Sequence, residues 1–146
     1  MVVSTTTLND IPLFEDLDEG ALQTISSMMH LVKVEEGEVL AQRGEPAHSF
    51  YVILSGNYLV SFAGGRSFTL HEKGQIVGWS SIVTPFKYTA TAVALTHGQA
   101  LSMSSEDFRQ LLQEDPRISE KLMLKISAII SQRMPFVTGT KSSLGL

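Results

Sequence analysis

Apolar residues recur along this chain with two different spacings. In residues 18–30 they lie three or four positions apart, a spacing that predicts an amphipathic helix. In residues 31–103 the spacing falls to about two, and glycine-containing turns interrupt it at short intervals, which is typical of short strands. Helical spacing returns from Ser104 to about Arg133. The pattern therefore predicts a mainly β middle flanked by helices.

The middle segment divides into about eight short strands separated by turns. The expected strands are residues 31–34, 38–42, 49–54, 58–62, 67–71, 75–77, 90–95 and 99–103. Short strands at even spacing indicate an eight-stranded β-barrel or jelly roll (a double-stranded β-helix). Three pairings are expected across turns: that of 49–54 with its return strand 58–62, that of 58–62 with 67–71, and that of 90–95 with 99–103.

Two helices are expected after the last strand. Ser104 precedes acidic residues, a combination that favours a helix start, and Pro116 is suited to the first turn of the next helix. Pro135 is expected to end that helix. The expected organisation is a flexible lead-in at 1–9, one domain at 10–133 and a flexible tail at 134–146.

Composition places the chain among globular proteins. Of its 146 residues, 43% are hydrophobic and 18% are charged, so the chain can bury one core. The net charge is −4 and no segment concentrates Lys and Arg, so we expect no direct binding to nucleic acid. The sequence has no apolar run of membrane-spanning length and no signal-peptide pattern. We therefore expect a cytoplasmic protein without a membrane contact.

Neither catalysis nor metal binding has a recognisable pattern. The chain has no cysteine, and its four histidines, His30, His48, His71 and His97, lack the spacing of metal ligands. It has no G-x-S-x-G elbow, and no G-K-[ST] follows Gly64 and Gly65. We therefore expect no enzyme activity, no metal and no cofactor.

Residues 74–93 carry the candidate ligand site. Gly78 follows a short apolar strand and tolerates backbone angles that a side chain disfavours. Ser80 and Ser81 suit the start of a short helix, whose exposed amides favour anions, phosphate above all. A strand of small and β-branched residues follows Tyr88. This order predicts an anion-binding loop between two strands.

The same stretch resembles the phosphate-binding cassette of cyclic nucleotide-binding domains. Family members have about F-G-E-L-A-L and then R-T-A-T, where this chain has V-G-W-S-S-I and then K-Y-T-A-T; the matching positions are Val77, Gly78, Ile82, Thr89, Ala90 and Thr91. The family's glutamate, which binds the ribose 2′-hydroxyl, falls on Trp79, and its phosphate-binding arginine falls on Tyr88. The resemblance implies a ligand site formed by Gly78, Trp79, Ser80, Ser81, Tyr88 and Thr89.

The resemblance extends beyond the cassette. Residues 11–22 resemble the opening helix of the family, and the glycines and strand within 37–56 resemble its strand-and-glycine pattern, so that the resemblance covers about Pro12 to Arg133. It implies a regulatory domain in which ligand binding moves the C-terminal helices, and these pass the change to an attached output. No helix-turn-helix follows in this sequence, and whether the chain acts alone, in a complex or as part of a longer protein stays open.

Two functions remain open at this point. The first is a sensor of a small anion, with cyclic GMP or cyclic AMP as the expected ligand, bound weakly because both charged groups are replaced. Family members that prefer cyclic GMP often carry a threonine at the position of Thr89, so the resemblance implies a preference for cyclic GMP. The second is a ligand-independent module that dimerises or holds a partner protein through the helix at 116–133, which is apolar on more than one face.

Two residues of the cassette have alternative interpretations. Trp79 either stacks on a base or fills the hollow that a lost ligand would leave, and filling is the interpretation we favour. Lys87 adjoins Tyr88 but is expected to face solvent, because neighbours on a strand point to opposite faces.

Overall fold

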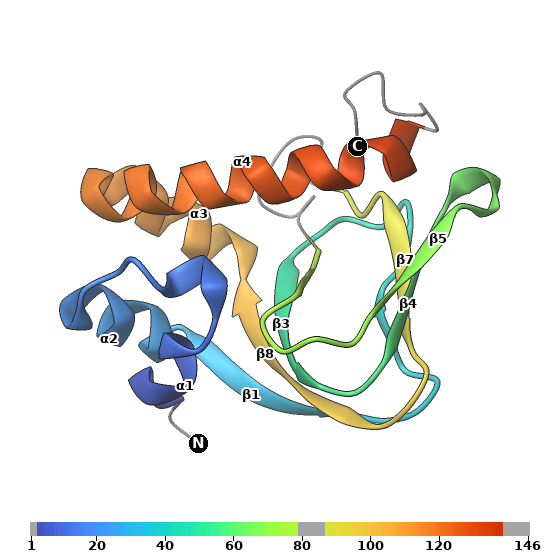
Figure 1. The fold of residues 1–146 in the computed structure, drawn as a ribbon, viewed down its shortest axis with the longest axis horizontal. Coiled ribbons are helices and arrows are strands. Elements are labelled where there is room, and N and C mark those ends of the chain that lie inside the picture. Colours follow the sequence, from blue (N-terminus) through green and yellow to red (C-terminus); the bar gives the residue numbers. More distant parts are fainter. Residues whose placement is uncertain (1–2, 79–86, 139–146) are drawn as a thin grey trace.

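The computed structural model of the chain describes residues 3–78 and 87–138. Its helical segments are α1 (Thr5–Asn9), η1 (Pro12–Phe14), α2 (Glu19–Ser27), η2 (Ala63–Gly65), α3 (Ser105–Glu114) and α4 (Pro116–Thr138). Its strands are β1 (Met29–Val34), β2 (Val39–Ala41), β3 (Ser49–Ser55), β4 (Tyr58–Phe62), β5 (Ser67–Leu70), β6 (Ile76–Val77), β7 (Ala90–Ala94) and β8 (Gly98–Ser104). In Figure 1 the helices α1, α2 and α3 lie beside the strands, and α4 runs from them across one end of the strands.

The eight strands form two antiparallel sheets, with the strand orders β1-β8-β3-β6 and β2-β7-β4-β5. This arrangement confirms the expected mainly β fold of the jelly-roll type. The sheets are stacked as a sandwich rather than closed into a barrel, because no ladder within the described residues joins one sheet to the other. The hairpin of β4 and β5 is also confirmed, with Tyr58 opposite Leu70 and Ser61 opposite Ser67.

The expected pairings of residues 49–54 with 58–62 and of residues 90–95 with 99–103 are both wrong. β3 pairs with β6 and β8, and β4 pairs with β5 and β7. β7 pairs with β2 and β4, whereas β8 pairs with β1 and β3, so the turn between β7 and β8 carries the chain from one sheet to the other. A turn signal shows only that the chain changes direction. The partner of each strand is set by which distant strands complete the ladders and bury the apolar faces.

The N-terminal segment differs from its expectation in two places. The expected lead-in contains α1, in which Ser4 caps the helix and Leu8 is fully buried, because the first residues dock on the core rather than fray. The helix expected over residues 18–30 ends at Ser27. Met29 and His30 instead begin β1, where they lie opposite Met103 and Ser102, so tertiary pairing overrides helical spacing at this boundary.

The C-terminal helices begin where expected. The Ser104 hydroxyl accepts a hydrogen bond from the Asp107 amide at 3.3 Å, and Asp115 Oδ1 accepts one from the Ile118 amide at 3.3 Å. The expected end at Pro135 is wrong, since α4 continues to Thr138. A proline inside a helix removes one backbone donor and crowds the carbonyl four residues earlier, but it can kink a helix without ending it.

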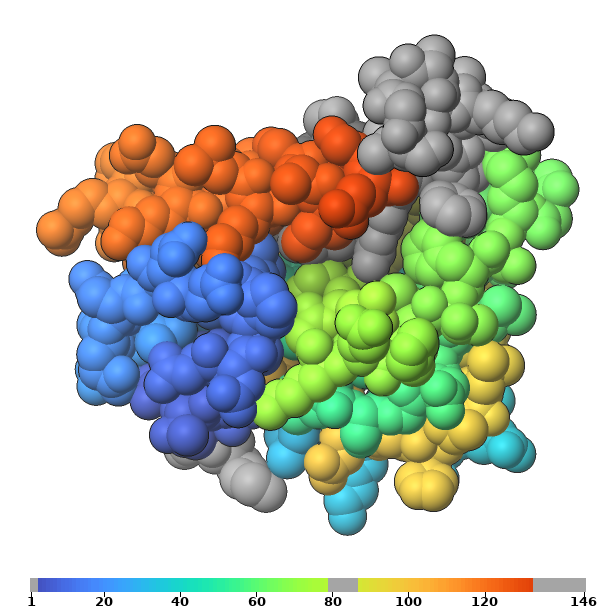
Figure 2. All heavy atoms as spheres, viewed as in Figure 1, coloured from blue at the N-terminus to red at the C-terminus, as the bar shows by residue number. Residues whose placement is uncertain are grey.

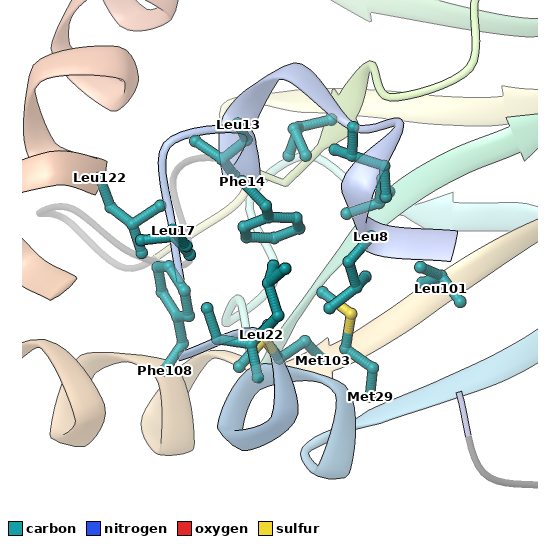
Figure 3. Packing of buried hydrophobic residues seen from close by; sticks show 14 of the residues in the cluster. Leu8, Leu13, Phe14, Leu17, Leu22, Met29, Leu101, Met103, Phe108 and Leu122 are labelled. Carbon is teal, nitrogen blue, oxygen red and sulfur yellow. The ribbon is translucent and has the colours of Figure 1, made fainter. Parts of the chain in front are cut away.

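Apolar side chains form two clusters on opposite faces of the first sheet. Along β3, Phe50 and Val52 belong to the cluster under the helices, and Ile53 belongs to the cluster between the sheets. This is the alternation that a strand with two buried faces requires. Figure 3 shows the helical cluster, whose labelled members come from α1, η1, α2, β1, β8, α3 and α4 and the loop before α2. The cluster therefore joins both ends of the chain to the outer face of the sheet.

Candidate functional site

The candidate ligand site borders the part of the chain that the structure does not describe. Trp79, Ser80 and Ser81 lie outside the described residues, so their expected roles stay predictions. Gly78 lies directly before that stretch, and Tyr88 and Thr89 lie shortly after it. The described part of the site therefore consists of the end of β6, the entry to β7 and the turn between β2 and β3.

Gly78 lies where a side chain does not fit. Its φ is +97°, in the region that L-residues disfavour, as the sequence suggested. A Cβ at this position would lie 3.0 Å from the carbonyl oxygen of Ser49 and 3.2 Å from the Cα of Phe50. Gly78 thus lets the chain leave β6 in close contact with the backbone of β3.

Tyr88 is held by three hydrogen bonds. Its hydroxyl donates to the carbonyl of Ser49 at 2.6 Å. Its amide donates to the carbonyl of Glu45 at 3.0 Å, and its carbonyl accepts from the amide of Gly44 at 2.9 Å. The side chain is half-buried and packs against the cluster between the sheets. Tyr88 therefore has a defined position, with its hydroxyl directed at the protein backbone.

Burial keeps Tyr88 neutral. Desolvation raises the pKa of Tyr88 above its ordinary value, the electrostatic effect of Tyr51 raises it further, and the hydrogen bond to Ser49 lowers it in part. Burial also raises the pKa of Tyr51, with a further contribution from Glu38. Near pH 7 both phenols are uncharged, so Tyr88 cannot supply the positive charge that a phosphate-binding arginine carries.

Two other residues near Tyr88 have clear positions. Lys87 is exposed and forms an isolated bridge with Pro46, which confirms the expectation that it faces solvent. Thr89 is half-buried at the entry to β7.

One contact at this site was missed by the sequence analysis. The hydroxyl of Thr91 accepts a hydrogen bond from the Arg43 amide at 3.1 Å and fixes the turn after β2 to β7. The two residues are 48 positions apart. Local spacing therefore contained no signal for their contact.

The space between the sheets beside this site is rich in aromatic residues. Tyr58 is fully buried there and donates its hydroxyl to the Ser55 carbonyl at 2.8 Å, while Phe62 and Phe68 pack with ring centroids 5.7 Å apart. These side chains therefore fill the interior between the sheets. Within residues 3–78 and 87–138, no three His, Cys, Asp or Glu side chains group in a way that could hold a metal ion. None of the helices described there is both long and apolar enough to cross a membrane.

Known proteins were compared with the chain by sequence. The family model for the cyclic nucleotide-binding domain matches residues 31–115, more than half of the chain. An uncharacterized NTE family protein of Mycobacterium bovis is 23% identical over 136 residues, which cover 93% of this chain and 23% of that protein. A CRP-like cAMP-activated global transcriptional regulator of Mycobacterium tuberculosis is 26% identical over 115 residues, which cover 76% of this chain and 51% of the regulator. The chain thus spans between about a quarter and half of the length of these two relatives.

The fold was also compared with solved structures. A putative cyclic nucleotide-binding protein of Geobacter metallireducens superposes with a TM-score of 0.80, at 20% sequence identity. The superposition covers 90% of this chain and 98% of that one. At this identity the likeness establishes the jelly-roll fold and its flanking helices.

Proposed function

Because the chain belongs to the family of cyclic nucleotide-binding domains, we propose that it is a regulatory ligand-binding domain with weak or altered affinity for cyclic nucleotides. The hydrogen bond from the Tyr88 hydroxyl to the Ser49 carbonyl is the observation that supports the weak or altered affinity. A side chain that is neutral and already bonded to the backbone takes the place at which the family resemblance puts a phosphate-binding arginine. The anion thereby loses its charged partner.

The expected loss of affinity is large. A guanidinium and a phosphate form two parallel charge-assisted hydrogen bonds, and a Tyr hydroxyl offers one neutral donor. Loss of such a pair costs on the order of 2–5 kcal/mol. Trp79 takes the place of the glutamate that the resemblance assigns to the ribose, so a second polar contact is also replaced. Together these changes predict that cyclic AMP binds poorly or not at all.

The relatives support the ligand class and suggest an output. The mycobacterial regulator is named for its activation by cyclic AMP, and it shares 115 aligned residues with this chain. In both curated relatives the matching region is only part of a longer protein. We therefore propose that a ligand bound beside β6 and β7 changes the position of α4, and that α4 passes this change to a further domain or partner.

Calorimetric titration tests the proposed affinity. We expect the unaltered chain to bind cyclic AMP and cyclic GMP more weakly than about 10 μM, since a tighter complex needs roughly 7 kcal/mol. The double variant Trp79→Glu with Tyr88→Arg should bind more tightly by a measurable factor, because it restores both charged groups. Submicromolar binding of cyclic AMP to the unaltered chain would contradict the proposal.

A matched variant separates charge from shape. Tyr88→Phe removes the hydroxyl and keeps the ring, so it should leave the weak affinity for both nucleotides unchanged. If Tyr88→Phe alone bound cyclic nucleotides tightly, the hydroxyl rather than the missing charge would be the obstacle.

A nucleotide preference is proposed for Thr89. The family resemblance places a threonine after the arginine in members that prefer cyclic GMP, and Thr89 is half-buried at the corresponding position. We expect whatever binding remains to favour cyclic GMP over cyclic AMP, and Thr89→Ala to reduce that ratio. An unchanged ratio, measured by titration with both nucleotides, would remove the basis for this preference.

A second function is supported by α4. Along this helix Ile118, Leu122 and Ile126 are buried, whereas Leu124 is 76% exposed and Met123 is 37% exposed. Exposed large apolar side chains next to one another are costly in water and often mark contact surfaces. The surface of Met123 and Leu124 therefore supports a homodimer, or contact with a partner protein, as the ligand-independent role of the chain.

A further inference from the structure

The segment 10–16 contacts two distant parts of the molecule. On one side lies the loop of residues 72–75, which precedes β6. Lys73 Nζ forms an ion pair with Asp10 Oδ2 at 3.3 Å. Gly74 packs so closely on Pro12 that a Cβ at Gly74 would lie 2.8 Å from the Pro12 Cδ. The segment is thus in direct contact with the chain that leads to Gly78.

On its other side the same segment holds α4. Lys125 Nζ donates to the Pro12 carbonyl at 2.5 Å and to Glu15 Oε1 at 2.8 Å, and it lies 3.4 Å from Asp16 Oδ2. Only 22% of the Lys125 side chain is exposed, so this ammonium group is partly removed from water and depends on its three partners. Figure 2 shows the N-terminal segment, in blue, against both the orange atoms of α4 and the yellow-green atoms that precede the grey segment.

The residues between these two contacts are packed into the helical cluster. Ile11 and Phe14 are fully buried in the helical cluster, and Leu13 is nearly so. The Phe14 amide donates to the Ile11 carbonyl at 2.9 Å, which closes the turn of η1. A closely packed interior transmits a displacement instead of absorbing it. A push on Pro12 from the side of Gly74 is therefore expected to reach the partners of Lys125.

Backbone hydrogen bonds attach the loop 72–75 to β3. The Gly74 amide donates to the Ile53 carbonyl at 2.7 Å, and the Ile53 amide donates to the Gln75 carbonyl at 2.8 Å. Movement at the end of β3 or β6 consequently moves Gly74. Gly74 lies only four positions before Gly78, where the candidate ligand site begins.

We propose that residues 10–16 mechanically couple the loop 72–75 to the middle of α4, with Pro12 as the shared contact. A shift of Gly74 toward Pro12 displaces the Pro12 carbonyl from Lys125 and loosens α4. This coupling is a property of the free protein and stands whether or not a cyclic nucleotide binds. It supplies a route by which a change beside β6 reaches the helix that the proposed function assigns to output.

Hydrogen exchange of the full chain tests the coupling without any ligand. Gly74→Ala adds the methyl group that collides with Pro12, and we expect exchange of the α4 amides at 121–130 to rise roughly fivefold relative to those of β8. The matched control is Gly37→Ala. Both glycines have a positive φ, +96° at Gly74 and +84° at Gly37, but a Cβ added at Gly37 would have nothing within 4 Å. It should reproduce the backbone strain and leave exchange in α4 within about twofold of the unaltered chain.

A double-mutant cycle identifies the route. Lys125→Met should raise exchange in the same amides, and Gly74→Ala should add little to it, because the contact that carries the push is already gone. Independent, multiplicative effects of the two changes on exchange would overturn the proposal, and so would unchanged exchange of α4 in folded Gly74→Ala protein.

A third variant covers the case in which Gly74→Ala does not fold. Pro12→Ala removes the Cδ instead of adding an atom, so it relaxes the contact without a collision. Because a push from Gly74 then no longer reaches the Pro12 carbonyl, Gly74→Ala combined with Pro12→Ala should leave exchange of α4 within about twofold of Pro12→Ala alone. A further rise of α4 exchange in the double variant would show that the effect of Gly74→Ala does not pass through Pro12 and would overturn the proposal.

Discussion

Tyr88 combines a polar group with a half-buried position, and its hydrogen bond decides which charge state is stable. The hydroxyl donates to the Ser49 carbonyl, which only the protonated phenol can do. Burial raises its pKa, as it does for Tyr51 and Tyr58. The free energy of unfolding therefore depends on whether these three phenols keep their protons.

This linkage predicts a loss of stability at high pH. In the unfolded chain the phenols ionise near their ordinary pKa of 10.0, and in the folded chain they ionise later. Above pH 10 the unfolded state consequently holds fewer protons, and the free energy of unfolding falls as the pH rises. Urea unfolding between pH 8 and 11 should show this decline.

Tyr88→Phe provides the comparison for the high-pH prediction. At pH 8 it should cost about 0.5–1.5 kcal/mol, the value of one hydrogen bond. Its decline above pH 10 should be shallower than that of the unaltered chain, because Tyr51 and Tyr58 still titrate but residue 88 does not. Parallel stability curves for the two proteins would show that Tyr88 does not contribute to the pH dependence.

The helix α4 has two faces of different character. Ile118, Leu122 and Ile126 are buried in the cluster that the helices share with the first sheet, and Leu124 points away from it with 76% of its surface exposed. Leu122 and Leu124 are two positions apart and thus about 200° apart around the helix. The same residue type in the same helix therefore has two different environments.

Replacement of each leucine by alanine should separate these environments. Leu122→Ala removes fully buried atoms and leaves a cavity, so it should lower the free energy of unfolding by about 2–5 kcal/mol. Leu124→Ala should change it by less than about 0.5 kcal/mol, the usual range for an exposed site. Both values come from urea unfolding of the purified chain. Equal losses in the two variants would mean that Leu124 is covered in solution.

In the molecule as a whole, the helical cluster joins both ends of the chain. Leu8 from α1 and Leu122 from α4 lie in the same cluster as Met103 of β8 (Figure 3). The first sheet is consequently covered on both faces, by helices on one side and by the second sheet on the other. Among the large apolar side chains of residues 116–132, Met123 and Leu124 are the exposed ones, and they could be covered by contact with a second copy of the chain.

Sedimentation at micromolar concentration should therefore reveal a homodimer, and Leu124→Glu should shift it toward monomer. The glutamate places a charge in the apolar contact and leaves the buried face of α4 unchanged. An alternative is that the tail after α4 folds back over Met123 and Leu124, and a variant that ends at residue 138 tests it. If the unaltered chain is monomeric and stays monomeric without residues 139–146, the dimer is excluded.

Several features follow from neighbouring residues and were determined by the sequence alone. The β4–β5 hairpin, the cap at Ser104 and the start of α4 at Pro116 each depend on a few adjacent positions. For the same reason Gly78 was predicted to tolerate backbone angles that a side chain disfavours, and its φ of +97° is such an angle. The place of Tyr88 in the candidate site came from the family resemblance, and the roles of Trp79, Ser80 and Ser81 stay predictions.

Tertiary structure alone decided the features that join distant positions. Strand pairing sent β7 and β8 into different sheets, because each sheet is completed by strands that are far apart in the chain. Burial of Leu8 made a helix of residues that have little helical pattern of their own. The Tyr88 hydroxyl is directed at the Ser49 carbonyl 39 positions away, and Lys125 reaches Glu15 across 110 positions. Such contacts have no local signature, since they arise only when the packed core brings separate segments together.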